Sequence, residues 1–232
     1  MTAQMKQTNF KMIVQLLIVL VLVPFMPMIV SGAWGWWQAW AYAVLCILGF
    51  IISRVLAVRR NPDILKERSD SFGKEDAKPW DRILAPIVAL GSVVPLFLIG
   101  LDKCFGWTNP LGTYANLIAL IVIVVGYAVG SWALIENRFF SGVVRIQTDR
   151  GHHVVTTGPY RIVRHPGYAA SLWTYLATPI LLDSLWALLP TLLLVGALIL
   201  RTSLEDSTLQ AELPGYADYS KMTRYRLLPG IW

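Results

Sequence analysis

Long apolar runs separated by short polar segments dominate the pattern of this chain. Residues 12–53 and 104–135 hold no charged residue, and residues 166–200 are interrupted only by Asp183. A helix crosses the hydrocarbon core of a bilayer with about 20 predominantly apolar residues. The pattern therefore predicts an all-α, polytopic membrane bundle of about six transmembrane helices, near residues 12–31, 37–53, 83–101, 113–135, 167–182 and 184–200.

Turn signals and interfacial residues mark the ends of these spans. Gly32 and Gly35 separate the first two spans, beside four tryptophans typical of a membrane interface: Trp34, Trp36, Trp37 and Trp40. The last two spans hold about 16 residues each and rise about 25 Å as helix, so we expect a short helical hairpin. Cys46 and Cys104 lack metal-ligand spacing, and the sequence predicts no metal site.

Basic residues gather on one side of the predicted membrane. With the amino terminus inside, 19 of the 20 Lys and Arg residues fall in inner segments and only Lys103 falls outside, as the positive-inside rule requires. The pattern predicts an integral, multi-pass membrane protein with cytoplasmic N- and C-termini. Contact with anionic membrane lipids also accounts for the net charge of +6 without nucleic acid as a partner.

The chain is expected to form one domain with two parts. Residues 1–135 are interpreted as a four-helix transmembrane scaffold, and residues 136–232 as the functional half. The polar loop 136–166 and the polar tail 201–232 should meet, because the hairpin between them returns the chain to the same side. The mixed-charge segment 54–82 is interpreted as a solvated connector with a short amphipathic helix, with substrate gating as the alternative.

The most polar junction is residues 151–168, GHHVVTTGPYRIVRHPGY. It holds three histidines, two arginines and two tyrosines: His152, His153, His165, Arg161, Arg164, Tyr160 and Tyr168. Pro166 disfavours a helical conformation at His165, and irregular backbone near a membrane must be buried in protein or line a wet cavity. The cluster indicates a pocket for a polar ligand, although a single histidine of this kind is more typical of an ordinary interfacial residue.

Arg201 ends the last apolar run, and Glu205 lies one helical turn further. Both side chains project from the same face of a continuing helix and can pair; the alternative is a snorkelling arginine in a surface salt bridge. The tail adds three tyrosines among basic residues, which either anchor the chain at the membrane or wall a ligand: Tyr216, Tyr219 and Tyr225.

The chain carries a combined pattern of four parts in order. These are the histidine-bearing segment 151–168, which we call the histidine loop, the apolar hairpin, the segment from Arg201 to Leu209, and the tail tyrosines Tyr216 and Tyr219. This pattern resembles the isoprenylcysteine carboxyl methyltransferase and phospholipid N-methyltransferase families of integral membrane enzymes. The resemblance covers residues 136–232, whereas the first four spans are similar in hydropathy only.

The resemblance implies an S-adenosylmethionine cofactor held between the loop, the hairpin and the tail. The positions that would line its site are His152, Val155, Gly158, Pro159, Tyr160, His165, Pro166, Tyr168, Ala170, Glu205 and Asp206. The implied substrate residues are Arg164, Arg201 and Tyr216, and the implied catalytic residues are Arg201, Glu205 and Tyr219. Two positions depart from the family pattern: Ala170 stands where glycine is usual, and Asp206 replaces the second of two glutamates.

Methyl transfer from a sulfonium is an in-line displacement that needs mainly alignment of the reacting atoms. Carboxylates and aromatic faces suit a sulfonium cation and its amino group, and Glu205 and the tyrosines offer both. The expected function is membrane methyl transfer to a lipophilic or amphipathic acceptor: an isoprenylcysteine-like carboxylate, an aminophospholipid or a thiol. The oligomeric state is left open.

Two alternatives stay open. A membrane sterol or steroid reductase using NADPH would also carry a tail rich in tyrosine and arginine, but a 2′-phosphate would require more arginines and a larger cleft. A small, non-catalytic transporter would agree with the hydropathy, but it would show broken helices with polar residues in mid-membrane.

Overall fold

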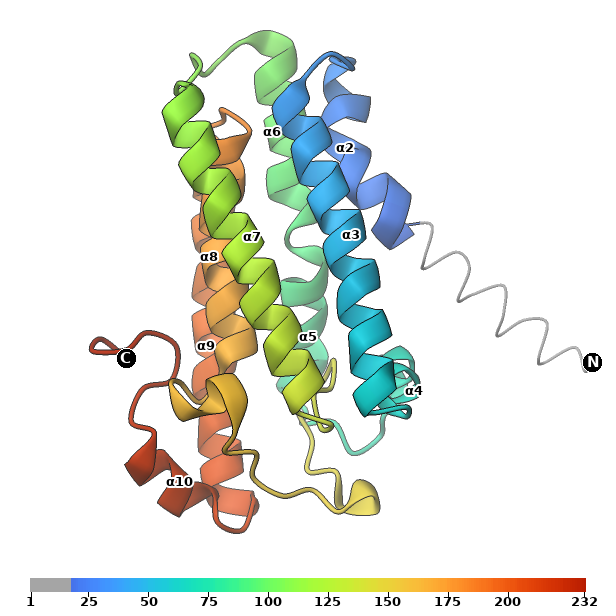
Figure 1. The fold of residues 1–232 in the computed structure, drawn as a ribbon, viewed down its shortest axis with the longest axis vertical. Helices are drawn as coiled ribbons and strands as arrows, with labels where there is room; N and C mark the ends of the chain where they lie inside the picture. Colours follow the sequence, from blue (N-terminus) through green and yellow to red (C-terminus); the bar gives the residue numbers. More distant parts are fainter. Residues whose placement is uncertain (1–17) are drawn as a thin grey trace, which may run out of the picture.

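The chain folds into a bundle of helices (Figure 1). The computed structural model describes residues 18–232. The helices of the bundle are the π-helix η1 Ile18–Leu22, α2 Val23–Ser31, α3 Trp37–Arg60, α5 Asp81–Leu90, α6 Val93–Phe105, α7 Thr113–Glu136, α8 Pro166–Leu181 and α9 Leu188–Glu212. The short helices at one end are α4 Ile64–Ser69, η2 Ser71–Gly73, η3 Thr148–Arg150, η4 Gly158–Arg161 and α10 Tyr216–Met222. Within the described range there is no strand, and the predicted all-α class is confirmed.

Four segments are long and apolar enough to cross a membrane: α3, the pair α5–α6 over Asp81–Phe105, α7 and α9. The chain is therefore an integral membrane protein. The predicted count of six is not confirmed, because α8 has 16 residues and the apolar segment Leu20–Ser31 is also short. The first predicted span starts at residue 12, outside the described residues.

Helix ends differ from the predicted span ends at two places. The predicted span 83–101 is interrupted between α5 and α6 at Gly91 and Ser92. The polar tail from residue 201 begins as a continuation of α9, which extends to Glu212. Hydropathy marks where a helix leaves the hydrocarbon, whereas the helix itself ends only at the Pro214 and Gly215 breakers.

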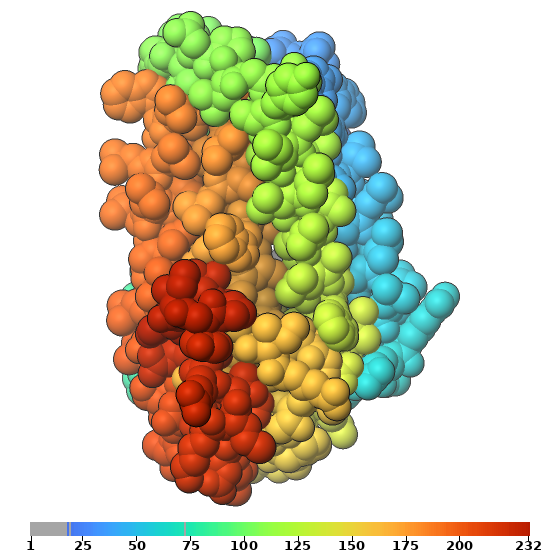
Figure 2. All heavy atoms as spheres, turned by 60° about the vertical axis from the view of Figure 1, so that its left-hand side comes forward, coloured from blue at the N-terminus to red at the C-terminus, as the bar shows by residue number. Residues whose placement is uncertain are grey.

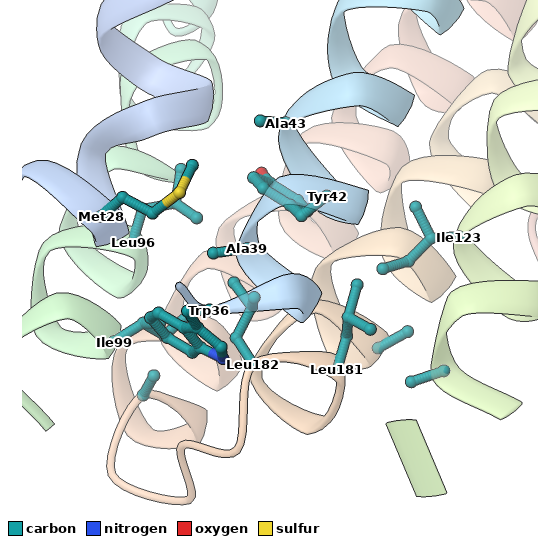
Figure 3. Packing of buried hydrophobic residues seen from close by; sticks show 13 residues of the cluster. Met28, Trp36, Ala39, Tyr42, Ala43, Leu96, Ile99, Ile123, Leu181 and Leu182 are labelled. Atoms are coloured by element: carbon teal, nitrogen blue, oxygen red, sulfur yellow. The ribbon is translucent and has the colours of Figure 1, made fainter. Parts of the chain in front are cut away.

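The main core lies away from the polar loops, where α2, α3, α6, α7 and α8 meet. Figure 3 shows its principal side chains: Met28, Trp36, Ala39, Tyr42, Ala43, Leu96, Ile99, Ile123, Leu181 and Leu182. Trp36 is buried here, so the predicted interfacial role is wrong for Trp36, while Trp34, Trp37 and Trp40 are exposed. Small residues let α7 and α8 approach closely, since a Cβ on Gly130 would stand 3.5 Å from the Ala170 Cβ.

Asp183 forms the turn of the α8–α9 hairpin, with a positive φ of 52°. Its Oδ1 atom accepts hydrogen bonds from the Leu111 amide and the Asn116 side chain, both at 2.9 Å. The one charged residue of the hairpin therefore fixes the hairpin to the start of α7 at the far end of the bundle.

Loop 137–165, the tail and the segment between α3 and α5 gather at the opposite end, which we call the loop end (Figure 1). Figure 2 shows the tail, in red, against the yellow and gold loop. The amides of Arg164 and His165 donate to the carbonyls of Tyr225 and Arg226 at 2.9 and 3.0 Å. The prediction that loop and tail meet is confirmed.

The segment 54–82 contains the expected short helix, α4, with Ile64 and Glu67 buried on one face, but the interpretation as a merely solvated connector is wrong. Glu67, Ser71 and Asp81 are buried within it. Ser71 Oγ accepts a hydrogen bond from the Gly142 amide at 3.0 Å, and Asp81 Oδ2 accepts one from the Val144 amide at 2.6 Å. The segment thus forms part of the support beneath loop 137–165.

Candidate active site

A cavity opens at the loop end between loop 137–165, the start of α8, the end of α9 and α10. It encloses about 810 Å³, including the open space at its mouth. We call it the loop-end cavity. Its polar lining residues are Asn137, Ser141, Arg145, Gln147, His152, His153, Tyr160, Arg164, His165, Tyr168, Glu205, Tyr216 and Tyr219.

Asp206 is the centre of the hydrogen-bond network beneath this cavity, and its side chain is fully buried. Its carboxylate accepts six hydrogen bonds from five side chains: Arg164, His165, Gln210, Tyr216 and Arg226. Arg164 binds it through two nitrogens, at 2.7 and 2.9 Å. Because these donors come from the loop, α9, α10 and the tail, Asp206 holds all four parts of the site together.

Glu205 is the carboxylate that faces the cavity itself. Its Oε2 atom accepts a hydrogen bond of 2.5 Å from the Tyr168 hydroxyl. Within the described chain, no arginine or lysine lies in ion-pair contact with Glu205. Its negative charge is therefore directed toward the cavity, where it favours a cationic or hydrogen-bond-donating ligand.

Three tyrosines complete the wall, and each has a fixed hydroxyl. Tyr219 donates to the Tyr160 carbonyl at 2.6 Å, and Tyr216 donates to Asp206 at 2.9 Å. Tyr160 accepts a hydrogen bond from Asn137 Nδ2 at 3.2 Å. Burial raises the pKa of Tyr219 to about 12 and that of Tyr216 further above its usual value. All three therefore remain neutral phenols at physiological pH, which suits packing against a ligand more than proton abstraction.

His152 lies against the ring of Phe139, with ring centroids 4.5 Å apart. Its Nδ1 atom accepts a hydrogen bond from the Gln147 amide at 3.3 Å, so its Nε2 atom carries the proton in the neutral ring. Burial, with the charges of His153, Arg145 and Arg150, lowers the pKa of His152 to about 4. The imidazole is neutral at physiological pH and offers a donor rather than a charge.

This pKa predicts an acid-sensitive contribution to stability. The unfolded imidazole takes up its proton near pH 6.5, and the folded one near pH 4. The contribution of His152 is therefore complete above pH 6.5, decreases as the pH falls, and is lost at about pH 4. The variant His152→Asn keeps an acceptor for the Gln147 amide and cannot titrate, so its melting temperature in detergent should fall less than that of the wild type across this window. An equal decrease in melting temperature with pH in the two proteins would contradict the lowered pKa of His152.

Arg201 does not pair with Glu205. Its Nε and Nη2 atoms donate to the two Asp81 oxygens at 2.6 and 2.9 Å, and Nη2 also donates to the Gly142 carbonyl at 2.9 Å. Its guanidinium lies 5.4 Å from the centre of the Tyr168 ring. Asp81 thus neutralises the charge of Arg201, which lies outside the lining of the loop-end cavity.

The predicted site residues separate into two groups in space. The lining of the loop-end cavity includes His152, Val155, Tyr160, Arg164, His165, Tyr168, Glu205, Tyr216 and Tyr219. The residues outside that lining are Gly158, Pro159, Pro166, Ala170, Arg201 and Asp206. Gly158 has a φ of 58° and forms the turn into η4. Pro159, Pro166 and Ala170 line a separate apolar cavity against α7.

Residues 137–147 were missed as lining residues. Asn137, Phe139, Phe140, Arg145 and Gln147 all face the loop-end cavity. The two phenylalanines are apolar residues in an otherwise polar loop, and this signal could have indicated a second part of the cavity wall. The burial of Arg145 is visible only in the structure. Arg145 binds Glu67 at 3.0 Å and Asp76 at 2.7 Å. Burial alone would raise the pKa of Glu67, but the hydrogen bonds and charge of Arg145 lower it.

The fold and cavity define an all-α integral membrane protein with a polar cavity at one end of its bundle. Residues 118–211 match the model of the isoprenylcysteine carboxyl methyltransferase (ICMT) family. The resemblance to this family is thereby confirmed over a stretch that contains most of α7, the histidine loop, α8 and α9 up to residue 211. The resemblance to phospholipid N-methyltransferases stays a prediction.

Curated plant proteins are similar over part of this stretch. "Probable protein-S-isoprenylcysteine O-methyltransferase" of Oryza sativa, in both subspecies indica and japonica, is 30% identical over 70 residues. These residues make up 30% of this chain and 37% of the rice proteins. "Protein-S-isoprenylcysteine O-methyltransferase A" of Arabidopsis thaliana is 36% identical over 70 residues, which are 30% of this chain and 36% of that protein. The similarity thus spans little more than a third of the length of these relatives.

Proposed function

We propose that this protein is an S-adenosylmethionine-dependent methyltransferase of the membrane, acting on the carboxylate of a lipophilic, isoprenylcysteine-like acceptor. The observation that carries the proposal is the loop-end cavity. Most of its lining lies in the stretch that matches the ICMT family, and Glu205 presents an unneutralised carboxylate to it. The names of the plant relatives supply the acceptor class, an isoprenylcysteine that is methylated on oxygen.

The chemistry of the lining fits the proposed cofactor. Glu205 suits its amino group or its sulfonium, and the faces of Tyr168, Tyr216 and Tyr219 suit a cation or a flat base. The neutral His152 offers a donor to polar oxygens. When bound, S-adenosylmethionine supplies a methyl group on a positively charged sulfur, and transfer to a carboxylate oxygen gives a neutral ester and a neutral thioether.

The contribution of the chain is positioning. His165 and Tyr216 are held to the Asp206 carboxylate at 3.2 and 2.9 Å, and Glu205 is held by Tyr168. Side chains fixed in this way need little reorganisation when a ligand binds, so alignment of the reacting atoms can supply most of the rate. No base is needed, because the acceptor carboxylate is already ionised at neutral pH.

The lining also argues against a nicotinamide dinucleotide with a 2′-phosphate. Two arginines line the cavity, Arg145 and Arg164. Arg145 is neutralised by Glu67, Asp76 and Asp149, and Arg164 by Asp206. A phosphate would have to displace a carboxylate partner from one of them, at a cost in buried charge.

Glu205→Gln tests the cofactor site. The substitution keeps the size of the side chain and removes its charge, so we expect S-adenosylmethionine to bind about 10- to 100-fold more weakly. The measurement is isothermal titration calorimetry of the purified protein in detergent. Glu212→Gln is the matched control, because Glu212 ends the same helix outside the cavity and pairs with Lys78. No binding to the wild type would refute the proposed function.

The activity assay follows from the same proposal. Incubation with S-adenosylmethionine and an S-isoprenylated N-acetylcysteine should give a methyl ester, detected by mass spectrometry. An acceptor that carries a carboxamide in place of the carboxylate should give no product. Equal methylation of an aminophospholipid would show that the acceptor class is different.

A further inference from the structure

A second cavity adjoins the loop-end cavity, and two arginines face it. It lies between α3, α4, α7 and α8 and encloses about 850 Å³ including its mouth. We call it the arginine cavity, after Arg54 and Arg68. The two cavities share Phe140 and Gly167 in their linings, so a thin wall separates them. The described lining of the arginine cavity contains no Asp or Glu.

Arg68 stands in this cavity without an internal anion. Its Nη1 atom is buried and finds no hydrogen-bond partner among the residues that the structure describes. Its guanidinium lies 5.2 Å from the centre of the Phe140 ring, in the dividing wall. Burial lowers the pKa of Arg68 to about 9, and the positive charges of Arg54 and Arg201 contribute to this shift. Arg68 is still a cation at neutral pH, and a buried cation without an anion is costly.

The other buried arginines of the loop end differ from Arg68 in this respect. Arg145, Arg164 and Arg201 each bind at least one carboxylate of the chain at 3.0 Å or less. Arg201 is therefore unable to serve an incoming anion unless it releases Asp81. Arg68 lines the arginine cavity and has no carboxylate partner to release among the described residues, so it carries no such cost.

The arginine cavity continues into apolar space. It shares Phe50, Tyr127, Thr174 and Tyr175 with a third cavity of about 780 Å³, which extends between α3, α6, α8 and α9. Leu96 and Leu194 are among the apolar residues deeper in this third cavity. The combined space is cationic at one end and apolar at the other, which fits an amphiphile with an anionic head and a hydrocarbon chain.

We propose that Arg68, with Arg54 beside it, binds the carboxylate of the methyl acceptor in the arginine cavity, while the apolar chain of the acceptor extends toward Leu96 and Leu194. This inference rests on the proposed function. It assigns the acceptor anion to a residue of α4, outside the stretch that matches the ICMT family. The acceptor head then lies beside Phe140 and Gly167, and methyl transfer requires the Phe140 side chain to move aside so that the carboxylate oxygen enters the loop-end cavity.

The test compares two probes on the purified full-length protein in detergent: an S-isoprenylated N-acetylcysteine and its carboxamide. Arg68→Gln should weaken binding of the carboxylate at least tenfold. Binding of the carboxamide and of S-adenosylmethionine should change less than twofold, which also shows that the variant is folded. Arg68→Lys should recover part of the carboxylate affinity. Lys66→Gln, on the exposed side of the same helix, should change none of the three affinities.

Two outcomes would overturn the inference alone. One is wild-type carboxylate affinity in Arg68→Gln, and the other is an equal loss for carboxylate and carboxamide, each with S-adenosylmethionine binding intact. Failure of the wild type to bind S-adenosylmethionine would instead overturn the proposed function. The calorimetric measurement with the cofactor therefore separates the two failures.

Discussion

Asp206→Ala should lower the free energy of unfolding by about 3–5 kcal/mol, because it leaves Arg164 and Arg226 without their shared carboxylate. Arg164 is almost completely buried, so water cannot replace the lost partner. The same change removes the acceptor of the Tyr216 hydroxyl. The measurement is denaturant unfolding in detergent micelles, followed by tryptophan fluorescence.

A second readout follows from the location of Asp206. Arg164 also donates to the carbonyls of Thr223 and Arg224 at 2.9 and 2.7 Å, so its release should free the tail. We expect trypsin to cleave Asp206→Ala after Arg224 and Arg226 under conditions in which the wild type resists. Asp218→Ala is the control, because Asp218 forms an exposed pair with Lys221 and its removal should leave the free energy of unfolding almost unchanged. A loss as small as that of the control would show that Asp206 does not hold the site together.

Local patterns of the sequence were sufficient to predict the all-α membrane fold class and many residues of the candidate site. Charge-free runs reveal membrane helices because the bilayer excludes charge. The histidine loop and the tail were expected to meet because a hairpin returns the chain to the same side. The residues of the GHHVVTTGPYRIVRHPGY segment and of the tail that face the loop-end cavity follow from this proximity.

Pairing across long sequence distances was not predictable in the same way. Arg201 and Glu205 satisfy the helical spacing for a pair, yet Arg201 binds Asp81, 120 residues away, through two nitrogens. Two parallel bonds to a fully buried carboxylate outweigh a single contact along the helix. Glu205 is thereby left for the Tyr168 hydroxyl and the cavity.

The role of segment 54–82 was misjudged for a related reason. Its composition of acidic and basic residues is that of a solvated surface helix, and composition does not show which charges are buried. Glu67 is 5% exposed because Arg145, 78 residues further along, binds both of its oxygens. Arg68, the next residue, faces the arginine cavity instead. Only the three-dimensional arrangement separates a neutralised charge from one that is open to a ligand.

The pair of Asp81 and Arg201 should give the second large effect. Arg201→Met leaves Asp81 buried without its cation, and Asp81→Asn leaves Arg201 without its anion. We expect each change alone to lower the free energy of unfolding by about 3–5 kcal/mol. The double variant should lose little more than either single variant, so the double-mutant cycle should give a coupling of at least about 3 kcal/mol. Denaturant unfolding in detergent provides all four free energies.

The exposed pair of Asp218 and Lys221 gives the matched cycle. Its side chains are 80% and 76% exposed, so Asp218→Asn with Lys221→Met should show no measurable coupling. The double variant of Asp81 and Arg201 also distinguishes the two possible roles of Arg201. If Arg201 serves the structure, as its pairing indicates, the folded double variant should bind the carboxylate probe with affinity close to that of the wild type. Selective loss of carboxylate binding, with the carboxamide and S-adenosylmethionine still bound, would show that Arg201 and not Arg68 binds the acceptor carboxylate.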